Sequence, residues 1–489
     1  MKRKNWLIVA LLALVTFGLG MLANSIVERR TESAHLSRAN TDIKPFESRN
    51  EEWGKYFERE YQSWEKTADT TFRSKHMSSN NDDLLEQRPE MVVLWAGYAF
   101  AKEYTAPRGH MHAVEDVRNS LRTGSPSDTN KSPQPATCWT CKSPDVPRLM
   151  NQKGVANFYK ANWADFGHEV VNPIGCADCH DPKTMNLTIT RPALVEAFQR
   201  SGKDISKATH QEMRSLVCAQ CHVEYYFKGD EKYLTFPWDK GKKVEDIESY
   251  YDNAKFTDFT HKLSRAPILK AQHPDFEVFQ LGIHAQRGVS CADCHMPYKS
   301  EGGIKYTDHH VSSPLANINS TCQVCHRESE AVLAANVYER QDYVFDLRNK
   351  LEKQLAKVHF YAKFLWDNNA KEGDMKPILE LIRKSQWRWD YITASHGASF
   401  HAPIESQRVL ADGLYFAMQA ETKMNSLNDK MKIATEFVLP DFSTKAKAQM
   451  AIGLDIPKEK AAKERFIKNV VPQWLQKAKA NGTLISARN

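Results

Sequence analysis

The longest regular pattern of apolar and polar positions lies in the last third of the chain. Between Glu328 and about Asp367 there is neither Gly nor Pro, and apolar residues recur at helical spacing, which predicts one long helix. A second helix is predicted to begin near Pro377 and to run to His396. Alternation typical of strands is scarce throughout. The pattern therefore predicts a mainly α-helical protein with little β-structure and long C-terminal helices.

The first of these predicted helices is long for a compact domain. About 40 residues, at about 1.5 Å per residue, span roughly 60 Å. This length favours pairing with a second subunit, so we predict a homodimer. Simple packing against the rest of the chain is the alternative.

The most apolar stretch of the chain is at its N-terminus. Lys2, Arg3 and Lys4 precede an almost wholly apolar run from Trp6 to Ala23, which is typical of an export signal. No clear small-residue cleavage site follows, and the run is near the lower limit for spanning a bilayer, so an uncleaved N-terminal anchor is the alternative. We therefore predict that residues 1–30 are a signal peptide or anchor, and that the rest of the chain is periplasmic.

The ten cysteines form five Cys-x-x-Cys pairs with none left over. Four of the pairs are followed directly by histidine, in the segments Cys176–Cys179–His180, Cys218–Cys221–His222, Cys291–Cys294–His295 and Cys322–Cys325–His326. Histidine fills only 18 of 489 positions, so chance gives this pattern with a probability of about 10⁻⁵. The alternatives are zinc ribbons, disulfides and thioredoxin-like redox pairs, and zinc ribbons do not need a histidine directly after each pair. The pattern is the attachment signature of c-type haem.

The fifth pair, Cys138 and Cys141, is followed by Lys142 in place of histidine. An amine donates through one lone pair and has no second ring nitrogen, so it suits an iron whose opposite face stays open. The alternative is that Lys142 only follows a variant motif while a histidine ligates that iron. We predict five covalent c-type haems, with the chemistry at this one.

The positions of the cysteines suggest how the chain is divided. All five pairs lie between Cys138 and Cys325, which predicts a compact pentahaem catalytic domain over residues 31–326. Residues 327–489 are predicted to be a long-helix region that packs over the haems and forms the dimer contact. A loop rich in Pro, Ser and Thr, from Thr123 to Ala136, precedes the first pair.

The net charge gives little indication of a charged partner. Loss of residues 1–23 removes three positive charges and no negative ones, so the formal charge of +7 becomes +4. Ten propionates on five haems offset much of that excess. We therefore predict no nucleic-acid partner.

A haem that only transfers electrons needs a sixth ligand. Histidines outside the motifs can supply it, and position indicates, weakly, His110, His284, His309 and His401. By position alone, His310 remains an alternative to His309, and His396 remains an alternative to His401.

These residues resemble the pentahaem ammonia-forming cytochrome c nitrite reductases over nearly the whole chain after the leader. The motifs that carry the resemblance are CWTCK with Ser143-Pro144-Asp145-Val146, CAQCHVEYYF at 218–227, KAQHP at 270–274, YTDH at 306–309 and QWRWD at 386–390. The resemblance implies six-electron reduction of nitrite to ammonium at a lysine-ligated haem fed by four bis-histidine haems. It also implies a homodimer joined through the C-terminal helices. The implied electron donor is a membrane quinol-oxidising multihaem cytochrome or a soluble multihaem shuttle.

The resemblance also implies roles for individual residues. Lys142 would be the proximal ligand of the catalytic haem, and Arg122, Tyr225 and His273 would line its distal pocket. Each motif histidine would share its iron with a distal histidine. The pairs would be His180 with His309, His222 with His110, His295 with His401, and His326 with His284. A calcium ion beside the pocket would take the Glu224 side chain, the Tyr225 and Lys270 carbonyls and the Gln272 side chain.

The chemistry of the pocket residues agrees with these roles. Arg122 stays charged and offers a planar fork to an anion, His273 can pass protons, and Tyr225 can donate a hydrogen bond. The helical pattern from Pro274 to Gly288 predicts one helix that links this pocket to His284. Two alternatives stay open: an electron-transfer conduit with five closed haems, and a reductase whose principal substrate is sulfite or hydroxylamine.

Overall fold

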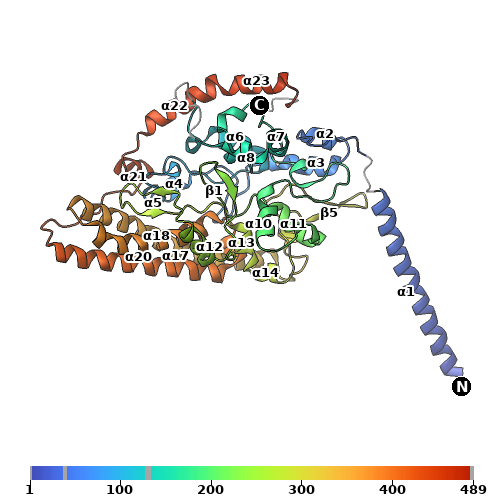
Figure 1. Ribbon diagram of the computed structural model, residues 1–489. Helices are drawn as coiled ribbons and strands as arrows, with labels where there is room; N and C mark the ends of the chain where they lie inside the picture. Colours follow the sequence, from blue (N-terminus) through green and yellow to red (C-terminus); the bar gives the residue numbers. More distant parts are fainter. Residues whose placement is uncertain (1–2, 37–40, 127–133, 485–489) are drawn as a thin grey trace.

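The computed structural model (Figure 1) describes residues 3–36, 41–126 and 134–484. Lys2, one of the basic residues before the apolar run, lies outside the described residues, as does the middle of the loop predicted from Thr123 to Ala136.

Three long helices form an extended bundle at one end of the molecule (Figure 1). They are α17 (Glu330–Asp367), α18 (Glu372–Ala394) and α20 (Pro403–Met431). The first begins two residues after Glu328, where the Ser329 hydroxyl accepts a hydrogen bond from the Val332 backbone N–H. The predicted long helix is therefore present, with both ends close to their predicted positions.

The predicted start of the second helix is wrong by five residues. Helix α18 begins at Glu372, and Pro377 lies inside it rather than at its first position. Glu372 and Asp374 lie in the first turn, where negative charge is favourable at the exposed N–H groups of a helix. The helix therefore accepts a proline one and a half turns in, where only one backbone hydrogen bond is lost.

The remaining helices are mostly short. In chain order they are α1 (Arg3–Leu36), α2 (Asn50–Gly54), α3 (Glu58–Glu65), α4 (Leu84–Gln87), α5 (Glu90–Leu94), α6 (Ala113–Asn119), α7 (Asp145–Lys153), α8 (Val155–Lys160), α9 (Cys176–Cys179), α10 (Pro192–Arg200), α11 (His210–Ala219), α12 (Val244–Asn253), α13 (Asp275–Gln280), α14 (Ile283–Gln286), α15 (Cys291–His295), α16 (Ile318–Thr321), α19 (Ala398–His401), α21 (Lys445–Ala451), α22 (Ile456–Asn469) and α23 (Val471–Ala480). The 3₁₀ helices are η1 (Lys66–Ala68), η2 (Ala99–Ala101), η3 (His110–His112), η4 (Leu121–Thr123), η5 (Ala136–Trp139), η6 (Trp163–Phe166), η7 (Ile205–Lys207) and η8 (Pro314–Ala316).

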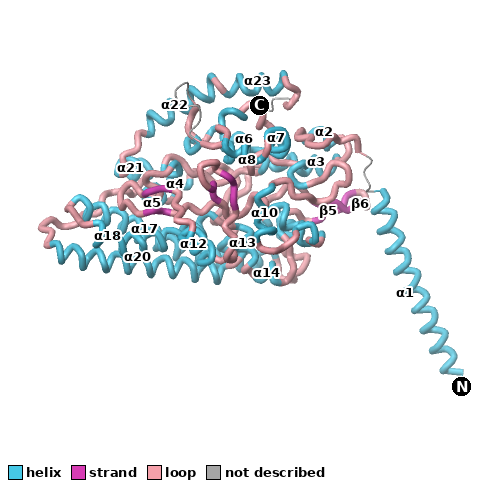
Figure 2. Tube along the Cα trace, viewed as in Figure 1, coloured by secondary structure: helices cyan, strands magenta, loops and turns pink. Residues whose placement is uncertain are grey.

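In the part of the chain that the structure describes, the strands, magenta in Figure 2, form three small antiparallel pairs. They are β1 (Tyr226–Lys228) with β2 (Tyr233–Thr235), β3 (Phe259–Thr260) with β4 (Pro267–Ile268), and β5 (Tyr298–Glu301) with β6 (Ile304–Thr307). The prediction of a mainly α-helical protein with little β-structure is confirmed.

The described residues pack around two apolar cores. The larger one packs α5 and the β3–β4 pair against the long helices, with Trp95 and Trp389 in contact at a ring-centroid distance of 5.4 Å. The smaller one surrounds Trp139 and Trp163, and Trp474 of α23 packs against it. Segments distant in the sequence thus close over the middle of the chain, where the cysteines lie.

Helix α1 projects away from this body (Figure 1). Its segment Ile8–Val27 is long and apolar enough to cross a bilayer, and none of it is buried against the protein. A secretion signal and a membrane anchor both have these properties.

The prediction of one continuous helix from Pro274 to Gly288 is wrong. The segment forms two short helices, α13 and α14, separated at Leu281 and Gly282. A Cβ added at Gly282 would lie 1.8 Å from the His401 carbonyl oxygen. The close approach of these two backbones requires glycine and breaks the helix there.

Candidate haem centres and substrate pocket

A cavity of about 1720 Å³ runs through the body of the protein. Its walls include cysteines of all five pairs, namely Cys138, Cys141, Cys176, Cys179, Cys218, Cys221, Cys291, Cys294 and Cys322. None of the ten cysteines forms a disulfide. The thiols and the cavity therefore fit covalent attachment of several haems.

The local backbone places the residue after each pair next to its two thiols. The backbone N–H groups of His180, His222 and His326 each donate to the carbonyl of the first cysteine of the pair, at 2.9 Å. One helical turn thus brings each histidine over its pair.

The turn that carries Lys142 is built differently. The Lys142 backbone N–H donates to the carbonyl of Trp139, three residues back, at 3.0 Å, as in a 3₁₀ turn. Trp139 is fully buried, stacks on Trp163 at a centroid distance of 4.8 Å, and donates its indole N–H to the Trp163 carbonyl. A rigid aromatic pair therefore anchors the lysine turn.

Three motif histidines each face a second histidine across the cavity. The ring-centroid distances are 6.1 Å for His180–His309, 6.2 Å for His295–His401 and 6.3 Å for His326–His284. Two metal–imidazole bonds of about 2 Å each, plus half of each ring, require about 6 Å between centroids. The spacing of all three pairs fits bis-histidine ligation.

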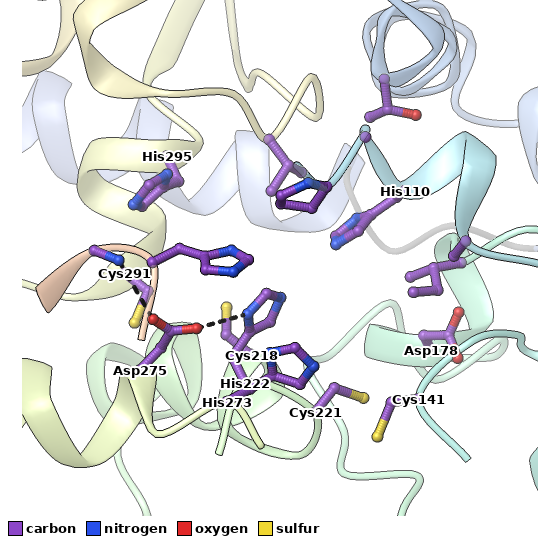
Figure 3. Close-up of a pocket in the computed structure, with 18 of the residues that line it drawn as sticks. His110, Cys141, Asp178, Cys218, Cys221, His222, His273, Asp275, Cys291 and His295 are labelled. Carbon is purple, nitrogen blue, oxygen red and sulfur yellow. Dashed lines mark hydrogen bonds and ion pairs between the residues drawn. The ribbon is translucent and has the colours of Figure 1, made fainter. Parts of the chain in front are cut away.

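The fourth expected pair of haem ligands is His222 with His110. His110 lies in η3, and Figure 3 shows its ring and that of His222 directed into the same part of the cavity. Burial and then the nearby charge of His222 lower the pKa of His110 to about 4. Burial likewise lowers the pKa of His180 and His401 to about 4. These imidazoles are therefore neutral at pH 7, as metal ligation requires.

Hydrogen bonds to one ring nitrogen of a histidine determine which of its two nitrogens is free to bind a metal. The Nδ1 atoms of His180, His295 and His309 lie 2.8, 3.0 and 2.8 Å from backbone carbonyl oxygens. Each ring then keeps its proton on Nδ1 and directs Nε2 at the cavity.

The structure distinguishes the two pairs of histidines that position alone left open, His309 against His310 and His401 against His396. His310 lies beside His309 and is half-buried, whereas the His309 ring is the one that faces His180. His396 faces His273, not a motif histidine, with ring centroids 6.2 Å apart. The sequence offered His396 only as an alternative to His401 and gave no signal for a place beside His273.

The residues expected around the catalytic haem line the same cavity: Lys142, Arg122, Tyr225 and His273. Arg122 is held by its Nε donation to the Ser120 hydroxyl at 3.2 Å, and its guanidinium lies over the Phe100 ring at 4.7 Å. Burial, then the charge of Lys142, lowers the pKa of His273 well below its ordinary value. His273 is therefore a neutral imidazole that can accept a proton on one nitrogen while it donates from the other.

The residues expected around calcium also lie together. The Glu224 carboxylate is fully buried and accepts from the Tyr251 hydroxyl at 2.9 Å and from the Gln272 backbone N–H at 2.6 Å. The Gln272 side chain contacts the Lys270 carbonyl at 3.1 Å. Burial raises the pKa of Glu224 well above its ordinary value. A buried carboxylate beside carbonyl and amide oxygens is a donor set that fits a hard cation.

Besides the Glu224 carboxylate, that cation would need carbonyl and amide oxygens as ligands. Among residues 3–36, 41–126 and 134–484, no group of three or more His, Cys, Asp or Glu side chains is placed to hold a metal ion.

The thiol pairs, the facing histidines and the shared cavity define a multihaem c-type cytochrome. The family model of cytochrome c552 matches residues 49–483, and the chain belongs to that family. This confirms the family resemblance found in the sequence.

Close relatives share the whole length of the chain. Cytochrome c-552 of Parabacteroides distasonis is 62% identical over 482 residues, with 98% of each chain covered. Cytochrome c-552 of Porphyromonas gingivalis is 60% identical over 487 residues, with 99% of this chain and 98% of the relative covered. A solved structure of cytochrome c nitrite reductase from Desulfovibrio desulfuricans, a catalytic subunit with two calcium sites, is 30% identical. It superposes with a TM-score of 0.76 over 86% of this chain and 91% of its own.

Proposed function

We propose that the chain is a periplasmic, ammonia-forming nitrite reductase in which Lys142 ligates the catalytic haem and four bis-histidine haems deliver electrons. The observation that carries the proposal is Lys142, which replaces histidine in one of five motifs and lines the same cavity as Arg122, Tyr225 and His273. The similarity to the nitrite reductase of Desulfovibrio desulfuricans adds support.

When bound, the catalytic haem supplies an iron centre and electrons for the reduction of nitrite. Arg122 binds the anion, because its guanidinium keeps its charge and is held in place by Ser120 and Phe100. Tyr225 lines the same cavity and donates its hydroxyl proton in a hydrogen bond to a substrate oxygen. These residues orient nitrite and exclude water from it.

Protons enter through His273 in this proposal. Reduction of nitrite to ammonium takes six electrons and consumes protons, so the pocket needs a group that accepts and releases protons repeatedly. The neutral ring of His273 faces His396 across 6.2 Å and can take up a proton on its unprotonated nitrogen.

The electrons come from outside the chain. Five haems store five electrons, one fewer than a turnover uses, so a donor is obligatory. We propose a membrane quinol-oxidising multihaem cytochrome or a soluble multihaem shuttle. Retention of the Ile8–Val27 segment would keep the enzyme at the membrane beside such a donor.

The activity is tested with purified holoprotein and a reduced viologen dye as the electron source. The proposal expects six electrons consumed and one ammonium formed per nitrite. Failure to form ammonium from nitrite would refute it. A larger kcat/KM for sulfite or hydroxylamine than for nitrite would instead identify a different principal substrate.

We also propose that residues 327–489 form the contact of a homodimer. Helices α17 and α20 expose large apolar side chains, including Tyr343, Tyr415 and Met418, which are 59%, 59% and 56% exposed. Tyr415 and Met418 are three residues apart and share a helix face. An exposed apolar face of this kind is typical of an interface.

This contact gives a testable prediction. The double variant Tyr415→Asp/Met418→Asp should sediment as a monomer, because two buried charges at an interface cost several kcal/mol. Met450→Asp is the matched control, since Met450 is 74% exposed but lies on α21. A double variant that remains dimeric in analytical ultracentrifugation would contradict this interface.

Calcium is the second proposed metal. We expect elemental analysis to find it in the purified protein, and Glu224→Gln to weaken its binding by at least about tenfold while all five haems remain. The control is Glu277→Gln, because Glu277 is equally buried but accepts from the Trp238 indole and the Glu224 backbone N–H. Activity that survives chelation, in protein without bound calcium, would dismiss this site.

A further inference from the structure

The motif histidines differ in what holds their second ring nitrogen. For His180 and His295 the partner of Nδ1 is a neutral backbone carbonyl. For His222 the partner is a carboxylate: Nδ1 lies 3.4 Å from Oδ2 of Asp275 (Figure 3). His326 also has a carboxylate nearby, Glu328, at 4.0 Å. The two histidines are similarly exposed, at 49% for His326 and 56% for His222, but Glu328 is 50% exposed, where water screens its charge, whereas Asp275 is 16% exposed.

The Asp275 carboxylate is held on both sides. Its Oδ1 accepts from the Ser395 hydroxyl at 2.9 Å and from the Gly397 backbone N–H at 3.5 Å. Both donors belong to the turn between α18 and α19, and the side chain of Asp275 is only 16% exposed. Neutral donors on one oxygen stabilise the anion and direct the other oxygen at His222.

A full negative charge in this position changes the electronic character of the ligand. Coulomb energy falls only as the inverse of distance, so a carboxylate at 3.4 Å acts more strongly on the imidazole than a carbonyl dipole at 2.8 or 3.0 Å. An acceptor of this kind increases the electron donation of the ring, which stabilises the more positive, oxidised iron.

We propose that Asp275 is a positioning residue that lowers the reduction potential of the haem attached at Cys218 and Cys221. The inference rests on the proposed ligation of that haem by His222 and His110 together. The haem lies next to the lysine-ligated centre, because the Cys141 thiol contacts the carbonyl of Gln220, the residue before Cys221, at 4.0 Å. A lower potential there favours passage of each electron onward to the catalytic haem.

The test is a spectropotentiometric titration of holoprotein variants. Asp275→Asn keeps the shape of the side chain and removes its charge. At a fixed potential it should lower the oxidised-to-reduced ratio of one low-spin haem about tenfold, an upward shift of about 59 mV for one electron. Ser395→Ala is the matched control: it removes one donor but leaves the carboxylate, so its shift should be much smaller.

A second variant separates the inference from the ligation on which it rests. His110→Ala removes the proposed distal ligand, so it should convert one low-spin haem to high spin and thereby identify the signal that shifts in Asp275→Asn. No spin change in His110→Ala would overturn the ligation, and the inference with it. A spin change with unaltered potentials in Asp275→Asn would overturn the inference alone. The inference would also be overturned if Asp275→Asn lost haem while Ser395→Ala retained all five, because Asp275 would then be needed for folding or haem attachment.

Discussion

His273→Ala is expected to lower kcat for nitrite by roughly 10²–10⁴-fold and to change KM little. The imidazole lines the pocket, faces His396, and has a pKa lowered by burial and then by Lys142. It is therefore unprotonated at pH 7 and can accept a proton and pass it on. Its removal should slow the proton-consuming steps while Arg122 still binds the anion.

Steady-state assays over a range of nitrite concentrations separate these effects. His273→Asn retains a hydrogen-bonding side chain that does not exchange protons near neutral pH, so it should be nearly as slow as the alanine variant. His168→Ala serves as the control, because His168 is not part of the cavity lining. A His273→Ala variant that changes KM and kcat equally would contradict the assigned role.

Arg122→Ala is expected to raise KM for nitrite by roughly 10- to 100-fold, with a smaller change in kcat. A hydrogen bond to a charged partner contributes about 1.5–3 kcal/mol, and Arg122 is the cation proposed to hold nitrite. Its fixed position over Phe100 means that little side-chain entropy is lost on binding.

The matched variant is Arg122→Lys, which keeps the charge but not the planar fork. We expect its KM to lie between those of the wild type and the alanine variant. If Arg122→Ala lowered kcat and left KM unchanged, the guanidinium would act in the reaction step and not in binding.

The haem attachment residues could be predicted from sequence because the motif is local. Two cysteines and the next residue occupy one helical turn, so the spacing alone brings them together. The long helix from Glu330 to Asp367 was predictable for a similar reason, since nothing in that stretch interrupts helical periodicity.

Contacts between distant segments were not predictable from local pattern. His309 and His401 face His180 and His295 because loops far apart in the sequence meet across the cavity. On residue spacing alone, His310 and His396 were equally good choices, and only the family resemblance separated them.

The interruption between α13 and α14 shows the same limit. The periodicity of Phe276, Phe279 and Ile283 favours one helix, and the break comes from a tertiary approach of Gly282 to the His401 backbone. The contact between Asp275 and His222, 53 residues apart in sequence, is also tertiary. Neither of these two contacts can be predicted from the local sequence around its residues.

The central claim is tested most directly by the coordination of the iron attached at Cys138 and Cys141 in the oxidised holoprotein. A crystal structure of that state should show the Lys142 amine on one side of the iron. On the other side it should show water or added nitrite, facing Arg122, Tyr225 and His273. A permanent protein ligand on that second side would contradict the account and leave a chain of five closed electron carriers.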